Sequence, residues 1–249
     1  MRTANPALNS STFDTFDSYA IERSNTMTLQ GTANKTAMLL ILLAASAGFS
    51  WVQLRQAGVQ AVTPYLIGGF AGSLIAGIAL WFKREWAAVL APVYAVGEGL
   101  VLGVISAMFE TRFQGIVFQA VCLTFGTLFS LLTAYRTGLI KATENFKLGV
   151  FAATGAIAIL YLVNMIMHLC GVGGFTFLHG SSPMAIGINA FIVVIAALNL
   201  VLDFDFIEQG VAHGAPKYME WYAGYGLLVT LVWLYVEILR LLSKINSRD

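Results

Sequence analysis

The chain has 249 residues, of which 58% are hydrophobic and only 11% are charged. A typical soluble domain carries roughly 25% charged residues, so this supply cannot cover the surface of a water-soluble fold. The composition therefore excludes a soluble enzyme and a disordered chain, and it predicts a polytopic membrane protein. Fourteen Lys and Arg against thirteen Asp and Glu leave a net charge of +1, which argues against a nucleic-acid partner.

Residues 1–35 are polar and rich in Ser, Thr and Asn. No basic segment followed by an apolar core and a small-residue cleavage site precedes the first apolar stretch. We therefore expect residues 1–35 to form an uncleaved, flexible cytosolic tail. The transmembrane domain is expected over 36–243, and a short basic tail over 244–249.

Seven apolar stretches of about 20 residues, the length that crosses a bilayer, follow this tail. Because backbone groups inside hydrocarbon must be paired within their own segment, each stretch predicts a helix. Short connections make neighbouring helices antiparallel, so the predicted fold is an all-α integral membrane bundle of seven transmembrane helices. The predicted spans are 36–54, 62–82, 86–109, 115–135, 148–170, 183–202 and 221–242.

Basic residues flank these stretches unevenly, and membrane proteins concentrate Lys and Arg on the cytosolic side. With a cytosolic N-terminus, the outer loops hold only Arg55 and Arg112. The basic C-terminal end would then lie outside, unless the last segment is re-entrant or the sixth span is broken. We favour seven spans with the N-terminus in the cytosol. The nine basic residues placed inside are Arg2, Arg23, Lys35, Lys83, Arg84, Arg136, Lys141, Lys147 and Lys217.

Small residues at four-residue spacing mark helix contacts in the second and third spans. Since four residues advance a helix by about one turn, each row falls on one face and predicts a close helix contact. The rows are Gly68, Gly72 and Ala76 in the second span, and Ala95, Gly99, Gly103 and Ala107 in the third.

Acidic residues fall within or at the end of three apolar spans. Glu98 lies near the middle of the third, Asp203 and Asp205 end the sixth, and Glu237 lies in the seventh. An ionisable group in the bilayer costs about 2.5–3.5 kcal/mol, so it normally faces a cavity, a partner or an ion path. Burial and a second carboxyl group both raise a carboxyl pKa, which makes these residues candidates for a proton switch.

Structural explanations of these acids remain open. The acids of the sixth span fit the polar end of a helix. Glu237 fits an i,i+3 pair with Arg240, and Glu98 fits a protonated, hydrogen-bonded structural residue.

The chain contains no recognisable set of catalytic residues. No GxxxxGK, HExxH, GxSxG or CxxC pattern occurs, and His168 and His179 do not make a metal-ligand set. We therefore predict no enzyme activity, no cofactor and no firmly assigned metal site. Cys122 and Cys170 each lie in an apolar run and are expected to be small buried hydrophobes.

Several segments of the chain resemble the Bax inhibitor-1 family, also called the transmembrane Bax-inhibitor-motif family, and specifically its bacterial branch. The most specific pieces are the run LDFDFIE at 202–208 and the segment 229–242, and all the segments match in order and spacing. The resembling segments are 27–36, 91–110, 135–141, 202–208 and 229–242.

The resemblance implies a seven-helix bundle whose last helix is wrapped by the other six, and a pH-sensitive leak of calcium. In relatives, an aspartate ending helix six hydrogen-bonds to an aspartate in helix seven, and their protonation gates the pore. The family's Asp-Phe-x-x-Ile motif matches 203–207, so the first of these aspartates corresponds to Asp203.

The second aspartate has no clean counterpart, because its position falls near Thr230. Glu237 lies seven residues farther on, on the same helix face but about 10 Å away along the axis. A direct pair between Asp203 and Glu237 is therefore not expected. The remaining candidate partners of Asp203 are Asp205, Glu220, a threonine hydroxyl and Arg84.

Two functions fit these observations. The first is a bacterial inner-membrane leak channel for Ca²⁺ or a similar cation, gated by protonation, since carboxylates suit hard cations. Glu98 and Glu237 would line its path, while Asp203 and Asp205 would control its cytosolic mouth. The second is a non-transporting membrane regulator that binds a protease or a stress or death-signalling protein through its tail and loops.

Overall fold

The computed structural model describes residues 25–175 and 180–247, and their fold is all-α as predicted. Within these two ranges the only β-type pairing is a single bridge between Thr26 and Pro216. The elements are α2 (Leu29–Phe82), the short 3-10 helix η1 (Arg84–Trp86), α3 (Ala87–Arg112), α4 (Ile116–Arg136), α5 (Glu144–Leu169), α7 (Pro183–Ala212) and α8 (Met219–Asn246).

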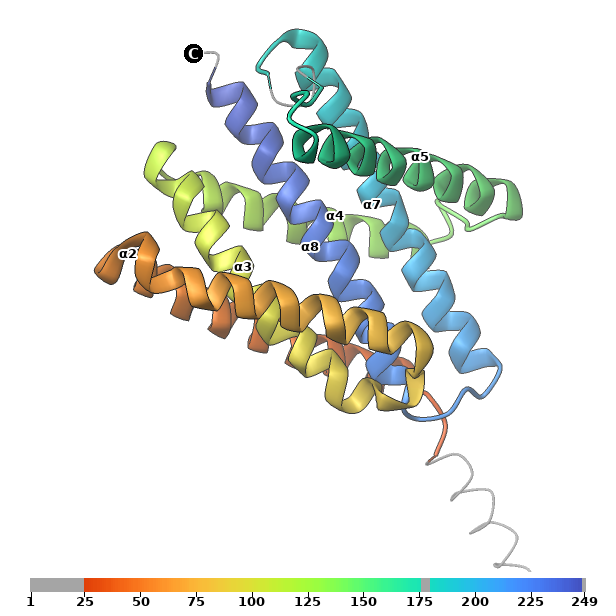
Figure 1. The fold of residues 1–249 in the computed structure, drawn as a ribbon. Helices are drawn as coiled ribbons and strands as arrows, with labels where there is room; N and C mark the ends of the chain where they lie inside the picture. The colour runs from red at the N-terminus through yellow and green to blue at the C-terminus, as the bar shows by residue number, and fades with distance from the viewer. Residues whose placement is uncertain (1–24, 176–179, 248–249) are drawn as a thin grey trace, which may run out of the picture.

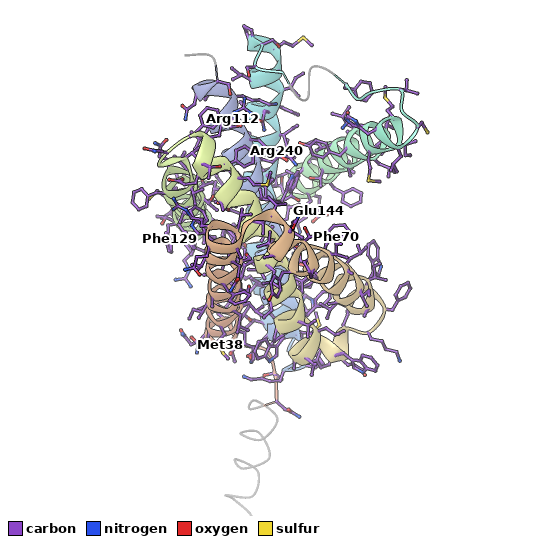
Figure 2. The ribbon with its side chains drawn as sticks, turned by 60° about the vertical axis from the view of Figure 1, so that its left-hand side comes forward. Met38, Phe70, Arg112, Phe129, Glu144 and Arg240 are labelled. Atoms are coloured by element: carbon purple, nitrogen blue, oxygen red, sulfur yellow. The ribbon has the colours of Figure 1, made fainter. Side chains whose placement is uncertain are left out.

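Six of the described helices are long and apolar enough to cross a membrane, so the chain is a multi-pass membrane protein. Large apolar side chains cover the outside of the bundle: Met38, Phe70 and Phe129, labelled in Figure 2, are 51%, 59% and 61% exposed. Apolar surface on this scale suits lipid rather than water. Cys122 and Cys170 are free thiols on the exposed surface, so the expectation that they are buried was wrong.

The first two predicted spans are joined in α2, because Gly58 is the one non-helical residue between them. Gly58 has φ 78°, a left-handed conformation that glycine adopts without steric cost. The rings of Phe49 and Tyr65 lie 5.4 Å apart, whereas sixteen residues of straight helix would separate them by about 24 Å. The chain therefore reverses at Gly58, and Figure 1 shows the first arm (29–57) beside the second arm (59–82).

Both arms of α2 pack closely on α3. A Cβ at Gly99 or Gly103 would collide with the first arm, so these two glycines of the predicted row do mark a contact. In the second arm, Gly68 and Gly72 face open space, and the contact is made by Gly69, which meets the backbone of α3. The two glycines of the predicted row therefore miss the contact by one position, a rotation of about 100° on a helix, whereas Ala76 of the same row is buried.

α7 continues ten residues beyond the predicted end of the sixth span at 202. The helix passes through Gly210 and ends before Gly214, which has φ 63° and follows the last helical turn. Asp203 and Asp205 therefore lie inside a helix and not at its end.

Residues 25–28, part of the predicted tail, are packed against the loop before α8. The backbone N–H of Met27 donates to the Ala215 carbonyl at 2.7 Å, and that of Lys217 donates to the Asn25 carbonyl at 3.0 Å. Since α2 begins directly after this segment, the predicted boundary at 35 falls inside a helix. The earlier part of the predicted tail lies outside the described residues.

α8 packs against α2, α3, α4 and α7, and Figure 1 shows it running through the middle of the bundle. Leu227, Leu231 and Leu234 of α8 are buried in the largest apolar cluster, together with residues of α4 and α7. The polar side chains that interrupt this apolar surface define the candidate site.

Candidate functional site along α8

Three polar layers interrupt the apolar surface of α8. They are centred on Glu220, on Thr230 with Asp203 of α7, and on Glu237. Spacings of ten and seven residues place them about 15 Å and 10 Å apart along the helix axis. Leucines lie between them, so each layer is a separate polar site in an apolar interior.

The Glu220 layer lies where α2 and α8 begin. The fully buried carboxylate accepts hydrogen bonds from the backbone N–H of Thr28 at 2.9 Å and from its hydroxyl at 2.8 Å. Lys217 forms an ion pair with the carboxylate at 2.8 Å, and Lys35 forms a second. Two cations and two neutral donors therefore satisfy this buried charge.

The Glu237 layer lies near the other end of α8. The carboxylate is 1% exposed and accepts hydrogen bonds from the Tyr161 hydroxyl and from Nδ2 of Asn189, each at 2.9 Å. Arg240 forms the i,i+3 ion pair considered from the sequence, at 2.9 Å, and its guanidinium lies over the Tyr161 ring. A cavity of about 320 Å³, lined also by Lys244, adjoins this layer.

The middle layer differs because no cation of the described residues forms an ion pair there. The Thr230 hydroxyl lies beside the Asp203 carboxyl group, and this hydroxyl donates to the Gly226 carbonyl at 3.3 Å. Oδ2 of Asp203 is buried and has no hydrogen-bond partner among the described residues. A buried carboxyl oxygen without a donor is costly when the group is charged, so this layer is the unbalanced one.

Asp205 lies apart from Asp203. Neighbours two apart on a helix point about 200° away from each other. Asp205 pairs with Lys147 of α5 at 2.9 Å and accepts from Nε2 of Gln209 at 2.6 Å. With Glu208, it lines a cavity of about 880 Å³ at the same end of the bundle as the Glu220 layer. The two aspartates thus have separate surroundings.

Glu98 and Arg84 lie outside these layers. Glu98 is half-buried, and Ser73 of the second arm of α2, Tyr94 and Tyr225 are close enough to interact with its carboxylate. The guanidinium of Arg84 lies over the ring of Tyr222, 5.4 Å from its centroid. Among the partners considered for Asp203, the structure therefore contains the contact with a threonine hydroxyl.

The sequence alone does not identify the partners of the buried carboxylates, because these partners are distant in the chain. Lys35 lies 185 residues from Glu220, and Asn189 lies 48 residues from Glu237. A partial signal existed for Asn189, because an amide inside an apolar span needs a hydrogen-bond partner. Within the described residues, no group of three or more His, Cys, Asp or Glu gathers to hold a metal ion.

Comparison with known proteins adds one finding. The family model described as Bax inhibitor 1 like matches residues 5–247. No curated protein and no solved structure matches the chain.

Proposed function

Because the chain belongs to the Bax inhibitor 1 like family, we propose that it is a pH-sensitive leak channel for cations, Ca²⁺ first among them. The observation that carries this proposal is the middle layer, where Asp203 has a buried oxygen without a partner and Thr230 offers only a hydroxyl. In this proposal Asp203 is the gate. The Ca²⁺ is the permeating substrate and not a resident ligand.

Seven crossings follow when each arm of α2 counts as one and α3, α4, α5, α7 and α8 supply five more. We place the N-terminus in the cytosol and the protein in a bacterial inner membrane. The contacts of the basic residues support this orientation, since Lys35 and Lys217 meet at Glu220, and Lys147 reaches Asp205 at the same end of the bundle. Figure 2 shows Arg112 and Arg240 toward the opposite end from Met38.

Protonation acts on the contact between α7 and α8. A neutral Asp203 fits beside Thr230 in the apolar interior, whereas an ionised Asp203 has no cation to balance it. In a membrane such a charge costs about 2.5–3.5 kcal/mol, so ionisation favours an arrangement in which α7 and α8 separate and water or a cation reaches the carboxylate. The leak is therefore expected to increase as the pH rises.

In this proposal the cation path runs along α7 and α8. Asp205 lies at the cytosolic end of this path, and the 320 Å³ cavity beside Glu237 receives cations at the other end. The Asp203 layer lies between these two ends. Glu98 lies on the α2–α3 side and serves as a second carboxylate near the path.

The test is Ca²⁺ flux into liposomes that contain the full chain, measured across a range of pH. Wild type is expected to leak more at high pH, and Asp203→Asn is expected to lose the pH dependence. The control is Glu144→Gln, which removes an exposed carboxylate at the end of α5 and leaves the flux unchanged. Equal flux in wild type and Asp203→Asn at every pH would refute the gate.

Absence of flux in all of these proteins would instead favour the second function, a membrane regulator of a protease or of a stress or death-signalling protein. That outcome would be followed by co-purification of partners with the full chain and with a chain lacking residues 1–24.

A further inference from the structure

One long groove runs between the first arm of α2 and α4. The first arm and α4 do not pack against each other within the described residues. The 880 Å³ cavity and a second cavity of about 310 Å³ lie between them and share Leu40 and Phe125 on their walls. We call this continuous space the α2–α4 groove.

The groove is open on the outside of the bundle. Ala37 and Ala44 of α2 and Phe125 and Phe129 of α4 line it and are also exposed. Its floor is the apolar side of α8, where Leu227 and other leucines lie. In a bilayer an apolar space open to this side faces hydrocarbon, which fills it, since water gains no hydrogen bonds there.

The length of the groove suits a lipid chain. On α2 its lining residues run from Leu29 to Trp51, which is about 33 Å of helix. This distance is close to the roughly 30 Å thickness of the hydrocarbon core. A single acyl chain from one leaflet therefore fits along the groove without leaving the membrane.

The wide end of the groove carries charges of both signs, two cations and two acids. Arg136 and Lys141 line it, both are exposed, and neither forms an ion pair within the described residues. Of the two acids beside them, Asp205 pairs with Lys147, and Glu208 accepts a hydrogen bond from the neutral Tyr135 hydroxyl. Arg136 and Lys141 are thus exposed cations without an ion pair among the described residues, and guanidinium and ammonium groups both bind phosphate.

We propose that the α2–α4 groove binds one phospholipid, with an acyl chain along the groove and the headgroup phosphate at Arg136 and Lys141. The apolar walls, the lipid-facing opening and the unpaired cations at one end each fit one part of that molecule. The bound chain would cover Leu227 of α8 and fill the gap that the protein itself leaves between α2 and α4. Lipid binding of this kind does not depend on the proposed flux.

The test uses the full chain in phosphatidylcholine vesicles with a small fraction of phosphatidylglycerol that carries a photoreactive group on its acyl chain. After illumination, the labelled residues are mapped by mass spectrometry. Labelling is expected to concentrate on the groove faces of residues 29–51 and 117–141. Uniform labelling of all lipid-facing helices, including α5, would overturn the proposal.

Filling the groove provides a matched comparison. Ala44→Trp puts a large side chain into the groove, whereas Ala45→Trp puts the same side chain on the neighbouring exposed position that does not line it. Groove labelling is expected to fall severalfold in Ala44→Trp and to stay unchanged in Ala45→Trp. Ala37→Phe, in the wider cavity, is a second filling variant in case the first is poorly folded. Equal labelling in Ala44→Trp, Ala37→Phe and Ala45→Trp would overturn the proposal.

The headgroup contact has its own variants. Arg136→Gln with Lys141→Gln is expected to reduce labelling about thirtyfold, because two cations near an anionic lipid together contribute about 2 kcal/mol. The control removes the same number of charges elsewhere, as Arg55→Gln with Arg112→Gln, neither of which lines the groove. An equal reduction by both double variants would show that only the net charge matters, and this would refute a defined headgroup site.

Discussion

The carboxyl group of Asp203 on α7 lies beside the hydroxyl of Thr230 on α8, and no cation reaches this pair among the described residues. The other two carboxylates buried against α8 have such a cation, since Glu220 is paired with two lysines and Glu237 with Arg240. Protonation therefore has different consequences in the three layers. Only in the middle layer does it remove a charge that nothing else neutralises.

Replacing Thr230 by an acid tests the middle layer. In Thr230→Asp two carboxyl groups face each other, and such a pair releases its protons in two separated steps. The pH dependence of Ca²⁺ flux in liposomes is therefore expected to change from one transition to a broader, two-step profile. Thr133→Asp, at an exposed position of α4, is the control and should keep the single transition. A single unchanged transition in Thr230→Asp would contradict the assignment of Asp203 as the gate.

The Glu220 layer is expected to be structural. Glu220→Gln removes the charge that holds Lys35 and Lys217, and hydrogen bonds to charged groups contribute about 1.5–3 kcal/mol each. Because both lysines can reach solvent, we expect a loss of about 2 kcal/mol and a lower Tm for the protein in detergent. Glu144→Gln, which removes an exposed acid, should leave the Tm unchanged. Equal melting temperatures for the two variants would show that the layer contributes no stability.

The Glu237 layer calls for a double-mutant cycle. Arg240→Met leaves a buried carboxylate with only neutral donors, and breaking a buried pair in this way costs about 3–5 kcal/mol. Since Arg240 is partly exposed, the lower end of that range is expected. Adding Glu237→Gln should recover part of the loss, because the uncompensated charge is then gone. Strictly additive losses in thermal unfolding would argue that the two side chains act independently.

The sequence predicted the features that depend on residues close together in the chain. Apolar runs located the spans, because a helix in lipid needs little else. The spacing of Glu237 and Arg240 suggested their ion pair, and the small residues of α3 marked a true contact. These features involve residues within one helix.

The rest depends on how helices meet, which a single sequence does not specify. Nothing near Glu220 in the sequence indicates that Lys35 would reach it, and Asn189 gave no hint of Glu237 as its partner. The first two predicted spans are two helices that meet at the non-helical Gly58, without the longer connection that the apolar pattern left between 54 and 62. In the second arm, spacing alone does not distinguish the helix face of Gly68 from that of Gly69. Packing against α3 shows that the face of Gly69 is the buried one.

That difference between glycine rows gives a further test. A Cβ at Gly99 would collide with Ser46 and the Leu43 carbonyl of the first arm, whereas one at Gly68 meets nothing within 4 Å. Overpacking a close contact typically costs about 1–3 kcal/mol, so Gly99→Val should lower the Tm in detergent and Gly68→Val should not. Valine has the same helix propensity at both positions, so intrinsic helix preference cancels between the two variants. If both variants melt at the same temperature, α3 does not approach the first arm of α2 through Gly99.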